Sequence, residues 1–306
     1  MSDLKVNIAG VELNNPIIVS SGTFGFGREY GEYFDLNELG AISVKGLTLK
    51  AREGNAAPRI AETPAGILNS VGLQNPGVQS FIKFELPELL KLRAKIIANI
   101  AGSTIDDYCE MARILSDTDV HMLELNISCP NVKAGGAQFG TDPKTVFAIT
   151  QAVKKAAKKP LIVKLSPNVT DIAEIARAAQ SGGADALSLI NTLLGMRIDV
   201  HTKRPVLNNN VGGLSGPCVK PIAVRMVWQV ANAVELPIIG MGGIMSGDDA
   251  CEFILAGASA VSIGSGMFKH PTLPIMVKEQ LTCYMQKHHY ERISDFCGAV
   301  TLNEPY

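Results

Sequence analysis

Eight short apolar runs recur along the chain, and helical or irregular segments separate them. Most runs are rich in β-branched and aliphatic residues without strict alternation, a pattern typical of strands that are covered on both faces. The runs are Pro16–Ser20, Ala41–Lys45, Lys95–Asn99, His121–Asn126, Pro160–Leu165, Ala186–Ile190, Pro237–Gly240 and Ala260–Gly264. This repeated alternation predicts one domain over residues 1–306, an α/β chain folded as a single parallel (β/α)8 barrel, the TIM barrel.

Helix signals stand between these runs. Asp142 precedes a proline and an apolar stripe, and proline is well placed in a first helical turn. Asp171 begins a second helical pattern, which a Gly-Gly pair ends at Gly182. Ser246 is expected to cap a third helix, which runs to Gly257.

Two intervals between the predicted strands are far longer than one βα unit. The extra segments, Leu47–Pro87 and Asn191–Gly216, are rich in Gly, Pro and Asn. Because they follow strand C-termini, they are expected as insertions on the catalytic face, forming a lid or a substrate pocket. A short segment before the first strand, Val6–Asn15, is expected to form a hairpin that closes the opposite end of the barrel.

Composition excludes several classes of protein. Hydrophobic residues make up 46% of the 306 residues and charged residues 19%, which suits a large core and excludes a disordered chain. The formal net charge of -1 gives no footprint for nucleic acid, and no apolar run approaches the roughly 18 residues of a membrane span. The N-terminus shows no signal-peptide pattern, so we expect a cytoplasmic protein with reduced thiols. The six cysteines lack zinc or iron–sulfur spacing, and no metal site is predicted.

The stretch HMLELNISCPNVKAGG, from His121 to Gly136, begins as a strand and ends as a polar loop. Pro130 cannot continue a sheet ladder, so the strand is expected to stop near Cys129. A thiol at the mouth of a strand, flanked by the amides of Asn126 and Asn131, suggests a reactive site. A buried structural cysteine at a strand-to-loop junction is the alternative, and the local sequence leaves both open.

Polar side chains cluster at the predicted strand C-termini. Lys45 and Lys164 lie inside apolar strands, where an ammonium is costly unless it faces a partner. We interpret them as functional, with pairing to a carboxylate inside the barrel as the alternative. Asn99 and Asn126 end adjacent strands, and their amides offer the donor and acceptor that a ring of alternating C=O and N–H groups requires.

The last two predicted strands end in glycine clusters, Gly240-Met-Gly-Gly243 and Gly264-Ser-Gly266. Glycines let the backbone approach a ligand, and a phosphate site after strands seven and eight recurs in barrels. Tight βα turns are the alternative. A phosphate site together with a lysine near the barrel axis suits flavin mononucleotide (FMN).

Several motifs in order along nearly the whole chain resemble class 1 dihydroorotate dehydrogenases. They are VKGLT, NSVGLQNPG, NISCPNVKAGG, KLSPNVTDI, INTL, GGLSGP, GMGGI and IGSGMF. Within class 1, the lysine-alanine-Gly-Gly after the cysteine and the run VRMVWQV are most similar to the class 1B catalytic subunit, which is linked to NAD+.

The resemblance implies roles for individual residues. Cys129 matches the family's catalytic base. The matches to FMN-binding positions are Ser21, Lys45, Gly46, Asn99, Asn126, Lys164, Ile190, Gly216, Gly242, Gly243, Gly264 and Ser265. The matches to substrate-binding positions are Lys45, Asn69, Ser70, Val71, Gly72, Leu73, Asn126, Asn131, Asn191 and Thr192.

The resemblance also implies a reaction and partners. Dihydroorotate would lose a proton from C5 to Cys129 and a hydride from C6 to FMN, giving orotate for pyrimidine biosynthesis. Class 1B enzymes form a heterotetramer, in which a homodimer of this barrel joins a second subunit that carries FAD and a [2Fe-2S] cluster and passes electrons to NAD+. The chain itself has neither iron–sulfur spacing nor a GxGxxG dinucleotide fingerprint.

Other functions stay open at this point. A class 1A homodimer would use fumarate, and a stable FAD- and iron–sulfur-containing partner would separate the two classes. A non-redox lyase with Lys164 as a Schiff-base amine would be colourless and trapped by borohydride. A scaffold barrel would bind a ligand without turnover. A flavin barrel acting on RNA is disfavoured by the missing basic surface.

Overall fold

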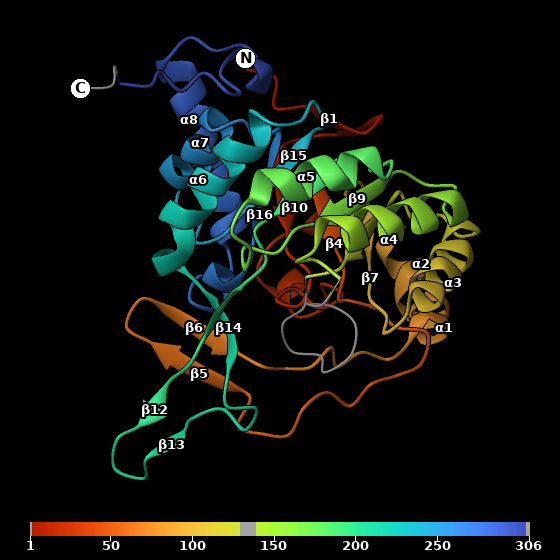
Figure 1. The fold of residues 1–306 in the computed structure, drawn as a ribbon. Helices are drawn as coiled ribbons and strands as arrows, with labels where there is room; N and C mark the ends of the chain where they lie inside the picture. Colours follow the sequence, from red (N-terminus) through yellow and green to blue (C-terminus); the bar gives the residue numbers. More distant parts are fainter. Residues whose placement is uncertain (1, 129–138, 304–306) are drawn as a thin grey trace.

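The computed structural model describes residues 2–128 and 139–303, and it confirms the predicted barrel (Figure 1). Eight parallel strands close into a ring that follows their order along the chain. Each of the eight predicted runs overlaps one of them, and β7 and β15 each extend one residue beyond the predicted run. The barrel strands are β3 (Ile17–Val19), β4 (Ala41–Ser43), β7 (Lys95–Ile100), β8 (Met122–Asn126), β9 (Leu161–Lys164), β10 (Ala186–Leu189), β15 (Ile238–Met241) and β16 (Ala260–Ile263).

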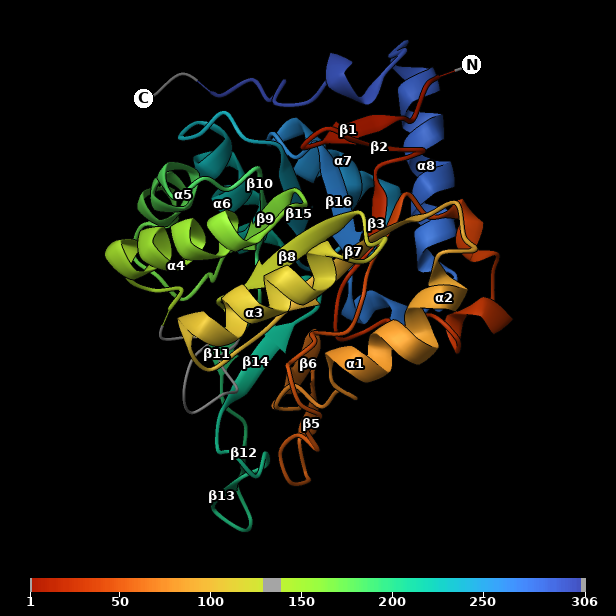
Figure 2. The same ribbon diagram turned by 90° about the vertical axis from the view of Figure 1, so that its right-hand side faces the viewer.

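Helices cover the outside of the barrel, and their apolar faces pack on the strands (Figures 1 and 2). A continuous helical segment precedes β7 and consists of α1 (Val78–Ser80), a wider turn at Phe81–Glu85, and α2 (Leu86–Leu89). The later helices are α3 (Ile105–Ser116), α4 (Pro143–Ala156), α5 (Ile172–Ser181), α6 (Lys220–Ala231), α7 (Gly247–Leu255) and α8 (Leu273–Lys287).

The first strand-to-strand connection departs from the expected alternation. Between β3 and β4 the chain forms only two short 3-10 helices, Tyr30–Glu32 and Leu36–Glu38. Gly22, Gly25 and Gly27 all have positive φ in this stretch. Repeated left-handed turns interrupt any longer helix.

The predicted helix starts are confirmed. The side chain of Asp142 accepts a hydrogen bond from the Thr145 amide at 2.8 Å, so it caps α4. Asp171 caps α5 and Ser246 caps α7 in the same way. These caps fix where each outer helix leaves the barrel.

The predicted N-terminal hairpin closes one end of the barrel. It consists of β1 (Val6–Ile8) and β2 (Val11–Leu13), which pair antiparallel. Ile8 and Leu13 are fully buried and pack against barrel-interior residues, among them Met122. The site must therefore open at the other end.

The two predicted insertions meet at that other end and form a small antiparallel sheet. The first contributes β5 (Ile60–Thr63) and β6 (Gly66–Asn69), and the second contributes β11 (Leu193–Gly195) and β14 (Gly212–Ser215). The order is β11–β14–β6–β5, so β14 joins the insertions by pairing with β6. A projecting hairpin, β12 (Ile198–Asp199) and β13 (Arg204–Pro205), extends from the same region (Figure 1). Sequence analysis predicted the position of both segments but not their shared sheet.

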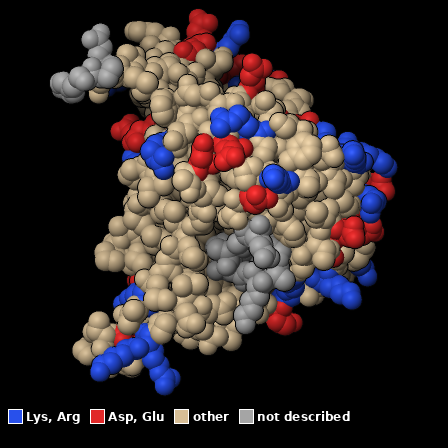
Figure 3. Space-filling model, in the orientation of Figure 1, with Lys and Arg blue, Asp and Glu red and all other residues tan. Residues whose placement is uncertain are grey.

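The surface carries charges of both signs. On the face in Figure 3, basic and acidic side chains are interspersed. Among the described helices, none has the length and apolar content needed to cross a membrane.

Candidate active site

A cavity of about 230 Å³ lies where the C-terminal ends of the barrel strands meet the inserted sheet. Its wall combines strand ends, the turns that follow β15 and β16, and residues of both insertions. The predicted site residues that line it are Ser21, Lys45, Gly46, Asn69, Val71, Gly72, Leu73, Asn126, Lys164, Ile190, Asn191, Thr192, Gly242, Gly243, Gly264 and Ser265. Residues more than 200 positions apart in sequence thus share one wall.

The remaining predicted site residues are not among the described residues that line the cavity. Asn99 is fully buried behind Asn126, whose Nδ2 donates to Asn99 Oδ1 at 3.2 Å. Gly216 supports the wall, and Ser70 is fully buried with a hydroxyl that has no hydrogen-bond partner among the described residues. Cys129 and Asn131 lie outside the described residues.

Lys164 brings a positive charge to the cavity. It ends β9, lines the cavity, and is only 5% exposed. Among the described residues, its ammonium group has no hydrogen-bond or ion-pair partner. A buried cation is costly unless an anion or an acceptor meets it, so the site suits a ligand with electronegative atoms. Lys45 adds a second, half-buried ammonium from the end of β4.

Two amides lie beside the lysines, and a glycine makes room for them. A Cβ atom on Gly46 would lie 2.9 Å from Asn99 Oδ1 and 3.3 Å from a methyl carbon of Leu73. Contacts below 3.0 Å essentially never occur for real Cβ atoms, so this position requires glycine. The backbone after β4 thereby approaches the amide pair closely.

A buried carboxylate that was not predicted from the sequence, Glu124, lies inside the barrel. Glu124 lies in β8 and is 3% exposed. It accepts hydrogen bonds from Ser43 at 2.9 Å, Asn99 at 2.5 Å and Ser188 at 2.7 Å. The signal was available, because Glu124 interrupts an apolar strand just as Lys45 and Lys164 do.

The turns after β15 and β16 form a cradle of backbone amides. Gly242 and Gly243 have φ values of 130° and 79°, which L-residues rarely adopt. Side chains are also excluded there, since a Cβ on Gly243 would lie 2.7 Å from the Gly216 carbonyl oxygen. Within the described chain, the N–H groups of Gly243 and Ser265 have no acceptor. Free amides in such a cradle fit a phosphate group.

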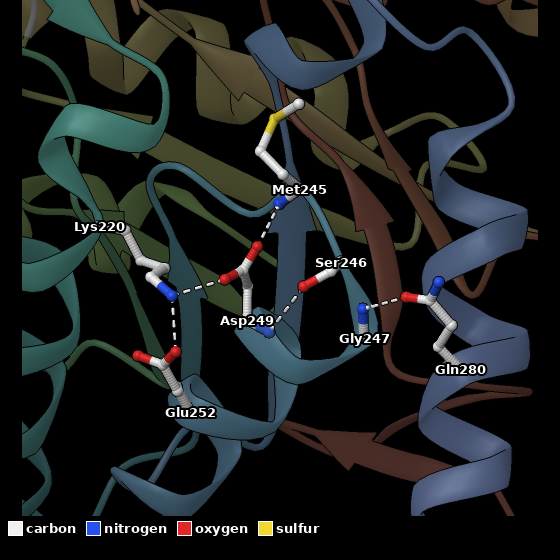
Figure 4. A network of polar contacts seen from close by, with 7 residues as sticks. All are labelled: Lys220, Met245, Ser246, Gly247, Asp249, Glu252 and Gln280. Carbon is white, nitrogen blue, oxygen red and sulfur yellow. Dashed lines mark hydrogen bonds and ion pairs between the residues drawn. The ribbon is translucent and has the colours of Figure 1, made fainter. Parts of the chain in front are cut away.

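A polar network holds the turn after β15 in place (Figure 4). Lys220 Nζ contacts Asp249 and Glu252, each at 2.5 Å, and Asp249 accepts from the Met245 amide at 2.8 Å. Burial lowers the pKa of Lys220, but the hydrogen bonds from its ammonium to Asp249 and Glu252 outweigh burial, and the net shift is upward. Lys220 and Asp249 therefore both stay charged at neutral pH. Their ion pair stiffens the loop that carries Gly242 and Gly243.

The closed barrel carries a cavity at its C-terminal end whose glycine cradle, buried lysine and amide pair suit a phosphorylated ligand. The family model for dihydroorotate dehydrogenase matches residues 3–285. The chain belongs to the dihydroorotate dehydrogenase family, a family of oxidoreductases, as the sequence motifs predicted.

Curated relatives agree along almost their whole lengths. The dihydroorotate dehydrogenase B (NAD(+)) catalytic subunit of Alkaliphilus metalliredigens is 61% identical over 97% of this chain and 99% of its own. Proteins of the same name from Thermoanaerobacter pseudethanolicus and Bacteroides fragilis are each 53% identical, over 98% and 99% of this chain and 100% of their own lengths. The resemblance to the class 1B catalytic subunit is therefore confirmed.

Proposed function

We propose that this chain oxidises dihydroorotate to orotate, with FMN held in the cavity, as a step of pyrimidine biosynthesis in the cytoplasm. The observation that carries the proposal is Lys164, a buried ammonium in the cavity wall without a partner among the described residues. The glycine cradle lies in the same wall, so one ligand with a phosphate and an electronegative ring would satisfy both. Family membership supports this choice of ligand.

Different residues of the cavity would bind the phosphate and the ring system of FMN. Gly242, Gly243, Gly264 and Ser265 would hold the phosphate with backbone amides. Lys164 would supply positive charge in the wall of the ring site. When bound, FMN supplies the acceptor for the hydride that leaves C6 of dihydroorotate.

The substrate would meet amides and a lysine. Asn69, Asn126, Asn191 and Thr192 line the cavity and offer donors and acceptors to the ring carbonyl and N–H groups. Lys45 would bind the carboxylate and stabilise the charge that develops at the C4 carbonyl as C5 loses its proton. Val71, Gly72 and Leu73 bring the backbone of the first insertion against the same space.

Cys129 would take the proton from C5. A thiol with an ordinary pKa of about 8.5 needs nearby positive charge to act as a base at neutral pH, and lysines lie in this site. Cys251 is no alternative, because burial raises the pKa of its thiol to about 12. Burial also raises the pKa of Cys297.

Replacing Cys129 tests the assignment. Cys129→Ala should retain FMN but slow its reduction by dihydroorotate about a thousandfold, because the proton at C5 loses its acceptor. The matched control is Cys283→Ala, which replaces an exposed cysteine. Its FMN should be reduced at the wild-type rate. Stopped-flow absorbance under anaerobic conditions measures both rates, and a wild-type rate in Cys129→Ala would refute the role.

We also propose that the electrons leave through a second subunit. The relatives are named catalytic subunits of an NAD(+) enzyme, which supports a separate subunit that carries FAD and a [2Fe-2S] cluster. The assembly would be a heterotetramer built on a homodimer of this chain. Fumarate reduction by the isolated chain, with no such partner retained on co-expression, would favour the class 1A arrangement instead.

A further inference from the structure

Glu124 is a buried acid that the proposed chemistry does not use. It lies in the barrel interior, and no lysine or arginine of the described chain forms an ion pair with it. Three donors surround it, and two of them, Ser43 Oγ and Asn99 Nδ2, reach the same oxygen, Oε2. A buried carboxylate with three donors and no counter-charge calls for an explanation, since burial of a charge is costly.

A row of hydrogen bonds connects Glu124 to the cavity. We call it the amide chain, and it consists of Glu124, Asn99, Asn126, Ser128, Asn191 and Thr192. From Thr192 to Glu124, each member donates a hydrogen bond to the next. Thr192 N donates to Asn191 Oδ1 (2.8 Å), Asn191 Nδ2 to Ser128 Oγ (2.7 Å), and Ser128 Oγ to Asn126 Oδ1 (3.4 Å). Asn126 Nδ2 then donates to Asn99 Oδ1 (3.2 Å), and Asn99 Nδ2 donates to Glu124 Oε2 (2.5 Å).

All five bonds have their donor on the Thr192 side and their acceptor on the Glu124 side. The groups at the two ends of the amide chain fix this direction. The first group, the Thr192 backbone N–H, can only donate. The last group, the Glu124 carboxylate, can only accept while it is ionised. Side-chain amides can be turned over when nothing fixes them, but here reversing Asn99 would place its carbonyl oxygen 2.5 Å from a carboxylate oxygen.

We propose that Glu124 is a positioning residue for substrate recognition, an inference that rests on the function proposed above. By accepting from Asn99, Glu124 sets the orientation of the Asn99 amide and, through it, that of Asn126. Asn126, Asn191 and Thr192 line the cavity, so the ring of the substrate meets donors and acceptors whose order is already fixed. The binding site is thereby pre-organised, and recognition does not require the amides to reorient.

The amide chain also reaches the catalytic segment. Ser128 is fully buried, accepts from Asn191 and donates to Asn126, and it immediately precedes Cys129 in the sequence. The same carboxylate therefore anchors the residue next to the proposed base.

Glu124→Met removes the terminal acceptor and keeps an unbranched side chain of similar length. Orotate should bind at least about tenfold more weakly, because the Asn99 amide loses the group that orients it. Glu124→Gln keeps an acceptor oxygen at the Oε2 position, while its amide nitrogen can face Ser188, whose hydroxyl can also accept. The Gln variant should therefore bind orotate within about threefold of wild type.

Ser188→Ala provides the matched control. It removes one hydrogen bond to the same carboxylate, at Oε1, without touching the bonds of the amide chain. A purely structural role for Glu124 would make Ser188→Ala and Glu124→Met weaken orotate binding together. The inference instead predicts that Ser188→Ala binds orotate as wild type does.

Calorimetric titration with orotate, corrected for bound FMN, measures all four proteins. Wild-type affinity in Glu124→Met, or equal losses in Glu124→Met and Ser188→Ala, would overturn the inference while leaving the proposed function intact. A wild-type protein that binds no orotate would refute the proposed function itself.

A third variant at this position, Glu124→Asp, tests the inference if Glu124→Met does not fold. Glu124→Asp keeps the charge but shortens the side chain by one methylene, which withdraws the carboxylate from Asn99. It should weaken orotate binding by about fivefold or more. Wild-type affinity in Glu124→Asp would contradict the role of the Glu124–Asn99 contact.

Discussion

Lys164 is a buried charge that should lower the stability of the protein without ligand. Its ammonium group is nearly buried at the end of a barrel strand, and the described residues supply no acceptor. The desolvation cost is therefore not offset until a ligand with electronegative atoms enters the cavity. Such a residue favours binding at the expense of the stability of the unliganded protein.

Lys164→Met should separate these two effects. The FMN-free variant should unfold at a temperature about 2 °C higher than FMN-free wild type, since the buried charge is gone. Its affinity for FMN should fall at least about tenfold. Thermal melts and fluorescence titration with FMN give the two values. The exposed residue Lys158, changed in Lys158→Met, is the control. Lower stability with unchanged FMN affinity would mean that Lys164 has a structural partner instead.

Single residues were predictable where the local pattern was unusual. Lysines inside apolar strands and glycine clusters after the last two strands were singled out in the sequence, and the structure places them in the wall of one cavity. Glu124 was overlooked, although it interrupts a strand in the same way. Its hydrogen-bond donors are Ser43, Asn99 and Ser188, which come from three other strands, and their spacing along the chain does not show that they lie close together.

At the level of elements, the barrel strands were predictable because each is short, apolar and bounded by turn residues. Helix starts were predictable because Asp142, Asp171 and Ser246 carry the capping oxygens themselves. The inserted sheet was not predictable, because β6 and β14 are distant in sequence and both contain glycine, which weakens the strand pattern.

The inserted sheet holds Thr192 in the cavity wall through a close backbone approach. Gly213 in β14 pairs with Leu194 in β11 and with Asn69 in β6. A Cβ atom on Gly213 would lie only 2.0 Å from Thr192 Oγ1. Glycine at this position therefore allows Thr192 to remain in the cavity wall.

Gly213→Ala should displace Thr192 and raise the KM for dihydroorotate about fivefold, with FMN content unchanged. The expected loss of stability is about 1–3 kcal/mol, as for other overpacked positions. Gly195→Ala is the matched control in the same sheet, because its nearest contact is a flexible Leu68 methyl group at 3.0 Å. Steady-state kinetics compare the two variants, and an unchanged KM in Gly213→Ala would contradict the placement of Thr192.

At the scale of the whole molecule, the two ends of the barrel differ: one is closed by apolar packing and the other carries the cavity. The N-terminal hairpin seals one end with Ile8 and Leu13, so that end contributes stability. The opposite end gathers lysines, amides and glycines from strands and insertions into one cavity. This division leaves one end of the barrel free for the cofactor and substrate sites proposed above.

Anaerobic mixing of the purified, FMN-loaded chain with dihydroorotate is a direct test of the proposed hydride transfer. The absorbance of the oxidised flavin at about 450 nm should fall within about a second, because the residues proposed to bind cofactor and substrate line one cavity. Bleaching by dihydroorotate without any partner subunit is the predicted result. A flavin-loaded protein whose spectrum does not change on adding dihydroorotate would contradict the proposed function.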